Sequence, residues 1–271
     1  MLTRSTRAFR KHLTRLPEAG GETSGVIEAP ATGSPEPALR MAVVGDSVAA
    51  GVGAPVLREA LPGELAAALT AITGRAVSWR VSARSGATLC TLRKHLLSGL
   101  TDPMTRWTPD LVVVMAGTND AMRLRSPWAL RREAQRLVRD IRLRLGPEVP
   151  VVFAGLPDLR GVDVLPRWVR GPLRLYVTLL DRQLRVVARR GRRVHHLHSG
   201  GMPEFPGPWM SSDRFHPSAQ GYRAWARVLA GRLSTLTDPP AAPAPPLGGA
   251  GPIRIRACAA GAGRAASPWR P

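Results

Sequence analysis

The chain has 271 residues, of which 44% are hydrophobic and 5% aromatic, and it carries a formal net charge of +20. This length accommodates one α/β domain of roughly 200 residues with further segments at both ends. Its two cysteines, Cys90 and Cys258, supply neither a disulfide framework nor a metal cage. Because no run of about 18 apolar residues occurs, we expect no transmembrane helix.

The positive charge raises the question of a nucleic-acid or membrane partner. All but two of the 39 basic residues are arginine, a bias typical of GC-rich coding. Much of the charge lies in the tails, since residues 1–16 carry five basic residues and no acidic one. No basic stripe is interleaved with aromatic residues, as a base-stacking surface requires. We therefore expect no nucleic-acid partner, while a weak contact of the basic N-terminus with an anionic surface stays open.

The two ends of the chain differ in composition from its middle. Residues 1–38 are predicted to be a basic leader and a linker rich in Gly, Pro, Ser, Thr and Glu, and residues 237–271 a tail rich in Pro, Ala and Gly. Both compositions favour disorder. The folded domain is expected over residues 39–236. No apolar stretch of about 7–15 residues follows the basic leader, so the pattern of a secretory signal is missing and a cytoplasmic location is expected.

Short apolar runs alternate with helical patterns along this domain. The runs are rich in valine and bounded by Gly, Pro or Asp, which predicts strands, while apolar residues at helical spacing predict helices. Ser126 followed by Pro127 provides one helix with an N-cap and a first residue. In chain order we expect strand 41–44, helix 62–72, strand 77–81, helix 89–97, strand 111–115, helix 127–145, strand 151–154, helix 173–187, strand 194–197 and helix 222–233.

This alternation predicts the fold class. Strands separated by helices form a parallel sheet that is covered on both faces. We therefore expect a three-layer α/β/α sandwich with a five-stranded, flavodoxin-like parallel sheet. In such sheets, functional sites form at the carboxyl ends of the strands. The residues directly after each strand are thus the candidates for chemistry.

Three of these residues suggest a catalytic triad. Ser47 follows the first strand in the motif Gly-Asp-Ser, and Asp213 and His216 precede the last helix. A serine hydroxyl is a weak nucleophile without an adjacent base, and a histidine serves as that base when its tautomer and direction are fixed. A spacing of three residues in a turn lets the Asp213 carboxylate reach Nδ1 of His216. We predict Ser47 as nucleophile, His216 as base and Asp213 as its orienting acid.

Acyl transfer also requires hydrogen-bond donors for the developing oxyanion. Gly86 follows the second strand, and Asn119, in the motif Gly-Thr-Asn-Asp, follows the third. The backbone N–H groups of Ser47 and Gly86 and the side-chain amide of Asn119 could supply three donors. Gly86 has no Cβ to obstruct the approach of a substrate. Asp46 and Asp120 are expected to support these loops through hydrogen bonds to the backbone.

Together these motifs resemble the SGNH hydrolase superfamily, also called the GDSL-type esterases and lipases, over about residues 40–235. The resemblance implies the α/β/α sandwich, the roles assigned above and a site without metal or other cofactor. Val48 stands where the leucine of the GDSL name would be, a position that varies in the family. The run of small residues at 49–53 resembles bacterial members. No Gly-x-Ser-x-Gly motif is present, so a nucleophile elbow of the α/β-hydrolase kind is not supported.

We accordingly expect a serine esterase that hydrolyses small-molecule or lipid carboxylic esters through an acyl-enzyme. A lysophospholipase, a thioesterase or a glycan deacetylase of the same fold remains an alternative. So does a non-catalytic basic surface that binds anionic membrane or nucleic acid. His195, His196 and His198 have no Cys, Asp or Glu at ligand spacing, so we expect no metal site there. The oligomeric state is left open by the sequence.

Overall fold

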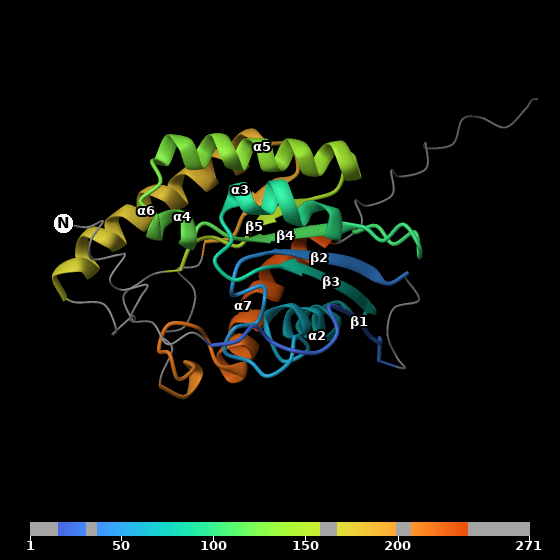
Figure 1. Cartoon of the computed structure of the whole chain (residues 1–271). Coiled ribbons are helices and arrows are strands. Elements are labelled where there is room, and N and C mark those ends of the chain that lie inside the picture. The colour runs from blue at the N-terminus through green and yellow to red at the C-terminus, as the bar shows by residue number, and fades with distance from the viewer. Residues whose placement is uncertain (1–15, 31–36, 158–166, 199–206, 238–271) are drawn as a thin grey trace, which may run out of the picture. The chain divides into compact units, whose positions relative to one another are not determined.

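The computed structural model describes residues 16–30, 37–157, 167–198 and 207–237, so the predictions for residues 1–15 and 238–271 lie outside the described residues. A six-stranded sheet runs through the centre in the order β1-β3-β2-β4-β5-β6 (Figure 1). Five strands are parallel and β1 is antiparallel to its neighbour. The strands are β1 (Ser24–Ile27), β2 (Leu39–Gly45), β3 (Val77–Ala83), β4 (Leu111–Met115), β5 (Val151–Phe153) and β6 (Val194–His196).

The five parallel strands lie where the valine-rich runs predict them, whereas β1 corrects two predictions. Residues 1–38 are predicted to be a disordered leader and linker, and the sheet is predicted to have five strands. Instead, Ser24 pairs with Arg80 at the start of an antiparallel ladder on β3. The N–H of Ala19 also donates to the carbonyl of Ala50 at 3.0 Å. A four-residue edge strand has no apolar period of its own, and its partner strand supplies the hydrogen bonds that order it.

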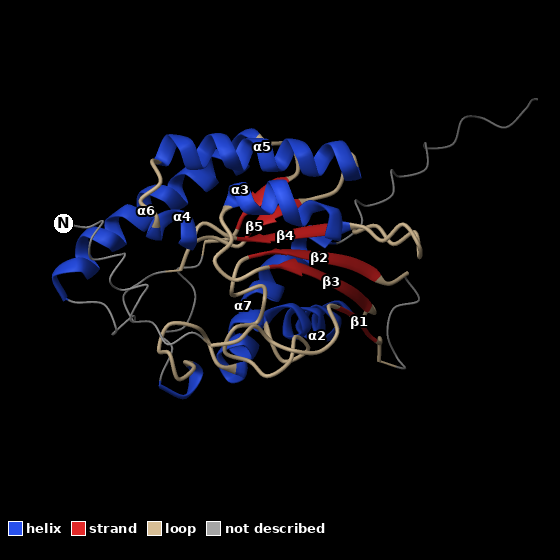
Figure 2. Cartoon of the chain, in the orientation of Figure 1, coloured by secondary structure: helices blue, strands red, loops and turns tan. Residues whose placement is uncertain are grey.

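Helices cover both faces of the sheet, which confirms the three-layer sandwich (Figures 1 and 2). Two of them pack against each other on one face, α2 (Leu61–Thr73) and α7 (Ala219–Thr237). The other face carries α5 (Pro127–Leu145) and α6 (Arg167–Arg190), together with the shorter α3 (Leu89–Thr91) and α4 (Thr118–Met122). The predicted N-cap is present, since Ser126 Oγ accepts from Ala129 N at 3.3 Å. A short 3₁₀ turn, η5 (Gly207–Trp209), precedes α7.

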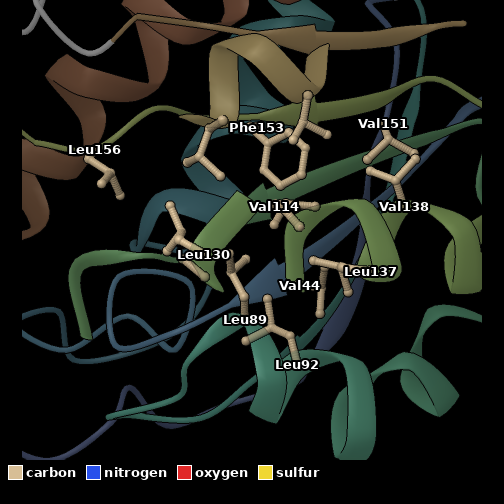
Figure 3. Packing of buried hydrophobic residues seen from close by; sticks show 14 of the residues in the cluster. Val44, Leu89, Leu92, Val114, Leu130, Leu137, Val138, Val151, Phe153 and Leu156 are labelled. Atoms are coloured by element: carbon tan, nitrogen blue, oxygen red, sulfur yellow. The ribbon is translucent and has the colours of Figure 1, made fainter. Parts of the chain in front are cut away.

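Each face of the sheet has its own hydrophobic core. Beneath α5, Val44 and Val114 of the sheet pack with Leu130 and Leu137 of the helix, and Phe153 fills the space beside them (Figure 3). All five residues of β4 are buried, as expected for a central strand that is covered on both faces. Within the described residues, no helix is both long and apolar enough to cross a bilayer.

The segment 89–97 differs from the single helix that its leucines predict. It forms α3, then a π-helical turn η1 (Leu92–Leu96), then a 3₁₀ turn η2 (Leu97–Leu100). Ser82 of β3 donates to the carbonyl of Leu96 at 2.8 Å, and a Cβ on Gly99 would lie 2.5 Å from that hydroxyl. Contact with the neighbouring strand therefore reshapes the helix, which local periodicity cannot show.

Candidate active site

The loop that carries Ser47 is anchored directly at the carboxyl end of β2. A Cβ on Gly45 would lie 2.5 Å from the carbonyl oxygen of Met115, so only glycine permits this approach to β4. The next residue, Asp46, donates its N–H to the same carbonyl at 2.9 Å. The chain then turns, with Val52 N donating to Ser47 O at 3.0 Å. Ser47 is thereby held at the edge of the sheet where the sequence places the site.

The structure brings Ser47, His216 and Asp213 together in one chain of hydrogen bonds. The Nε2 of His216 lies 2.8 Å from Ser47 Oγ, and its Nδ1 lies 2.6 Å from Asp213 Oδ2. A carboxylate can only accept, so it holds the proton on Nδ1 and leaves Nε2 free to accept from the serine. The Asp213 side chain is 1% exposed and that of His216 14% exposed, so solvent reaches the imidazole but hardly the acid.

Asp213 is kept ionised by the donors around it. Burial of the carboxyl favours the neutral form, but hydrogen bonds from His216, Ser211 and Phe215 outweigh burial and hold the pKa of Asp213 well below its ordinary value. Its Oδ1 accepts from Ser211 Oγ at 2.7 Å and from the N–H groups of Phe215 and His216, both at 2.9 Å. Ser211 is a supporting residue that was not predicted, because a serine five residues before the histidine, followed directly by Ser212, has no distinctive pattern.

Two further residues, which the sequence did not predict as part of the site, bring the segment after Ser47 against the segment after His216. A Cβ on Gly53, whose φ is +98°, would lie 2.3 Å from the carbonyl oxygen of Pro217, so glycine allows the loops to touch. Tyr222 in α7 is fully buried and donates its hydroxyl to the carbonyl of Val52 at 2.6 Å. These contacts set the spacing between serine and base, and the small-residue run at 49–53 was the only signal of them in the sequence.

The three predicted oxyanion donors lie just past the carboxyl ends of neighbouring strands, Ser47 and Gly86 in loops and Asn119 in the short helix α4. Within the described part of the chain, the N–H groups of Ser47 and Gly86 donate to no protein acceptor. Gly86 adopts φ +77°, and a Cβ there would meet nothing within 4 Å. The positive φ, rather than crowding by the protein, is therefore what favours glycine at this position. The Asn119 amide donates to Asp46 Oδ2 at 3.4 Å, which leaves its second hydrogen for a ligand.

Asp46 links the loop that carries Ser47 to Asn119 of α4. Its Oδ1 accepts from Val48 N at 3.2 Å, which is the backbone contact expected of a supporting residue, and its Oδ2 faces Asn119. The carboxyl is 3% exposed. Burial raises its pKa to about 7, although Val48, His216 and Asn119 favour the charged form. Asp46 thus carries a proton in the native protein over a pH range in which an exposed aspartate has lost it.

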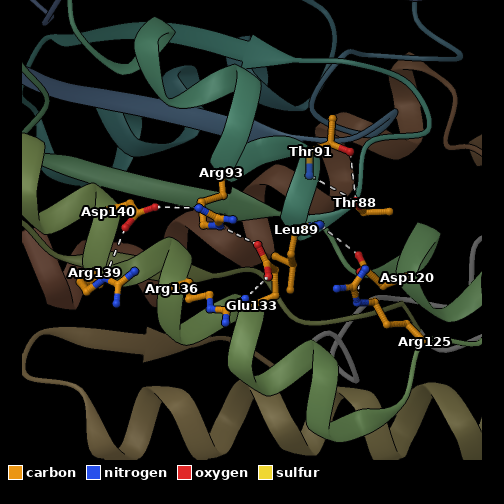
Figure 4. Close-up of polar contacts among 10 residues, drawn as sticks. All are labelled: Thr88, Leu89, Thr91, Arg93, Asp120, Arg125, Glu133, Arg136, Arg139 and Asp140. Carbon is orange, nitrogen blue, oxygen red and sulfur yellow. Dashed lines mark hydrogen bonds and ion pairs between the residues drawn. The ribbon is translucent and has the colours of Figure 1, made fainter.

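Asp120 joins α4 to the start of α3 (Figure 4). Its Oδ2 accepts from the N–H of Leu89, the first residue of α3, at 3.0 Å. Arg125 lies 3.8 Å from its Oδ1, and burial raises the pKa of this carboxyl above its ordinary value. Arg123 donates to the carbonyl of Gly86 at 3.2 Å. These hydrogen bonds join the Gly86 loop and the start of α3 to α4, the short helix that carries Asn119, and to the residue that follows it.

The histidines near β6 have a partner that the sequence did not reveal. His196 Nε2 lies 2.8 Å from Oδ1 of the buried Asp181 in α6, and that oxygen also accepts from Leu156 N at 2.9 Å. His198 Nδ1 lies 3.5 Å from the other carboxylate oxygen. Among the described residues, no group of three or more His, Cys, Asp or Glu side chains is placed to hold a metal. The hydrogen bonds of Asp181 tie β6 and the segment that follows β5 to α6.

The chain matches a known protein family and several solved structures. A family model described as the GDSL-like lipase/acylhydrolase family matches residues 43–224. No curated protein sequence matches the chain. Among solved structures, a Clostridium thermocellum family 3 carbohydrate esterase is 19% identical, with 73% of this chain and 96% of that chain covered and a TM-score of 0.55. A lipase/acylhydrolase from Enterococcus faecalis is 20% identical, with 75% and 100% covered and a TM-score of 0.54.

A third solved structure, of TesA, is 23% identical, with 73% of this chain and 99% of that chain covered and a TM-score of 0.53. At these identities the likeness establishes the fold, and the family match spans about two thirds of the chain. The chain therefore belongs to the GDSL-like lipase/acylhydrolase family, and it is an ester-hydrolysing enzyme with the SGNH hydrolase fold.

Proposed function

We propose that the protein is a serine esterase that cleaves carboxylic esters through an acyl-enzyme on Ser47. The observation that carries this proposal is the continuous hydrogen-bond chain from Asp213 Oδ2 through His216 to Ser47 Oγ, with distances of 2.6 and 2.8 Å. Such an arrangement is the geometric requirement for activating a serine hydroxyl. The ionised, buried Asp213 supports it, because a negative charge at Nδ1 stabilises the imidazolium that forms during the reaction.

In the first half of the reaction, Ser47 Oγ attacks the ester carbonyl carbon while His216 Nε2 takes the hydroxyl proton. The carbonyl oxygen becomes an oxyanion, which accepts hydrogen bonds from the N–H groups of Ser47 and Gly86 and from the Asn119 amide. His216 then protonates the leaving alkoxide, the carbon–oxygen bond breaks, and the alcohol departs. In the second half, His216 removes a proton from water as the water oxygen attacks the acyl carbon. The protonated His216 then gives this proton to Ser47 Oγ, the bond between Oγ and the acyl carbon breaks, and the free acid departs.

The substrate is proposed at the level of a small-molecule or lipid ester. Carbohydrate esterases and lipases both occur among the structural neighbours, which supports ester cleavage without selecting an alcohol. A lysophospholipase, a thioesterase and a glycan deacetylase would use the same triad and oxyanion donors. They differ in acyl length and leaving group, so a substrate series separates them. The proposed mechanism uses protein groups and water alone.

The test is hydrolysis of p-nitrophenyl esters of increasing acyl length by the wild type, Ser47→Ala and Asn119→Ala. Loss of the nucleophile should lower kcat by roughly 10⁶-fold. Loss of one oxyanion donor should lower it by roughly 10²–10³-fold with little change in KM. If the wild type and Ser47→Ala turned over equally slowly across the series, the esterase proposal would be wrong. Salt-sensitive binding of nucleic acid or vesicles without turnover would then favour the non-catalytic alternative.

A further inference from the structure

The helix α6 carries a second apolar face that points away from the core. Its buried face consists of residues at helical spacing that pack onto the sheet: Leu173, Val177, Leu180, Leu184 and Val187. On another side, Trp168, Pro172, Leu175 and Leu179 follow one another at intervals of four, three and four residues, which aligns them in one stripe. Trp168 is 60% exposed and Leu175 63% exposed. An apolar stripe of this length on a solvent-facing helix requires a physical explanation.

This stripe continues into a hollow beside the loop after α4. Leu124 and Tyr176 join three of the stripe residues to line a space of about 340 Å³. The Tyr176 hydroxyl donates to the carbonyl of Arg125, which fixes the loop against the helix and uses the one polar group of the lining. We call these six residues the α6 face: Leu124, Trp168, Pro172, Leu175, Tyr176 and Leu179.

The surroundings of the α6 face are strongly basic. The helix contains seven arginines, and its single acidic residue, Asp181, is buried and paired with His196 and Arg185. Arg174 and Arg182 are exposed on this helix. At the start of α5, the guanidinium of Arg131 lies 4.5 Å above the ring of Trp128, which is 69% exposed. An apolar stripe that includes a tryptophan, on a helix rich in arginine, complements an anionic lipid surface.

We propose that the α6 face docks the protein on an anionic lipid surface, with the stripe at the level of the headgroup–acyl boundary. In Figure 1 the N-terminal half of α6 extends past the sheet on the side of the carboxyl ends of the strands, where the site loops lie. Docking through this face would hold those loops close to the bilayer. The binding itself is independent of the proposed esterase function, and only its benefit for access to lipid esters rests on that function.

Vesicle flotation with the full chain tests this proposal. The wild type should float with vesicles that contain phosphatidylglycerol and remain behind with pure phosphatidylcholine, and high salt should weaken the binding. The double variant Trp168→Gln/Leu175→Gln should lose at least about tenfold in partition coefficient, since it removes two large apolar side chains from the contact. Gln preserves helix propensity. The matched control Ile72→Gln/Leu143→Gln replaces side chains that are 51% and 79% exposed on other helices and should bind as the wild type does.

Each outcome decides the proposal. Equal flotation of the double variant and the wild type would overturn it and assign the binding to other basic residues. Failure of the wild type to bind, or equal binding to both kinds of vesicle, would also overturn it. A fall in molecular mass of the double variant in size-exclusion chromatography, without vesicle binding by the wild type, would assign the face to a second copy of the chain. Turnover of soluble p-nitrophenyl acetate should be unchanged in all variants, which tests folding and the esterase function separately from docking.

Discussion

Replacing Asp213 with asparagine keeps the side-chain shape but changes one acceptor into a donor. In the native site, Oδ1 of this residue accepts from three groups, namely the Ser211 hydroxyl and the N–H groups of Phe215 and His216. An NH₂ group in that position would face three donors, so the amide oxygen must take it. The NH₂ group then occupies the position of Oδ2, which lies 2.6 Å from Nδ1 of His216.

Two donors cannot face each other, so Nδ1 must become the acceptor and the proton of the neutral imidazole moves to Nε2. That nitrogen lies 2.8 Å from Ser47 Oγ and can no longer accept the serine proton. The loss of the working tautomer should lower kcat by roughly 10⁴-fold, which corresponds to about 5 kcal/mol of transition-state stabilisation.

The assay is steady-state hydrolysis of a p-nitrophenyl ester by purified Asp213→Asn, with thermal unfolding of the same sample to show that it is folded. Asp110→Asn serves as the matched control, because Asp110 forms a half-exposed ion pair with Arg40 at 2.6 Å, just before β4 begins. Surface pairs contribute little, so this control should keep kcat within about twofold. A folded Asp213→Asn enzyme with kcat within tenfold of the wild type would refute the inference that Asp213 sets the tautomer of His216.

Three further substitutions test the support of the site. Burial raises the pKa of Asp46 from 3.8 to about 7, so the native state binds more protons than the unfolded state between these values and loses stability as the pH rises. Urea denaturation from pH 4 to 7 should show Asp46→Asn gaining stability relative to the wild type, and a constant difference would contradict the raised pKa. Gly53→Ala should unfold at lower urea than Gly146→Ala, because both glycines have positive φ but only Gly53 would place a Cβ 2.3 Å from Pro217 O; equal midpoints would show that the loops separate freely. Tyr222→Phe should lose about 1 kcal/mol of unfolding free energy, and an unchanged midpoint would mean that its buried hydrogen bond contributes nothing.

Much of the architecture was predictable because the signal is local. The central strands are short apolar runs rich in valine, and they lie where those runs predict them. A parallel sheet brings the carboxyl ends of its strands to one edge, so the loops after β2, β3 and β4 had to be neighbours. That topology accounts for how Ser47, Gly86 and Asn119, which are far apart in sequence, could be grouped before their positions were known.

Whether residues 24–27 form a strand was decided by tertiary pairing. Residues 24–27 are too few to show a period, and they become a strand only because β3 offers an unpaired edge. The break of segment 89–97 into three short helical turns has a similar origin, since Ser82 and Gly99 bring β3 against it. Such contacts join residues that no local pattern connects.

For the site, the sequence by itself determined which residue types follow each strand, and hence the identity of the candidate nucleophile, base and oxyanion donors. The tertiary structure alone decided what surrounds them. Three contacts show this: the hydrogen bonds donated to Asp213, the approach of Gly53 to Pro217, and the contact of Asp181 with His196. Each depends on groups that meet only in the folded chain. Hydrogen bonds and close contacts act over a few ångströms in space, and the distance between two residues along the chain does not determine that separation.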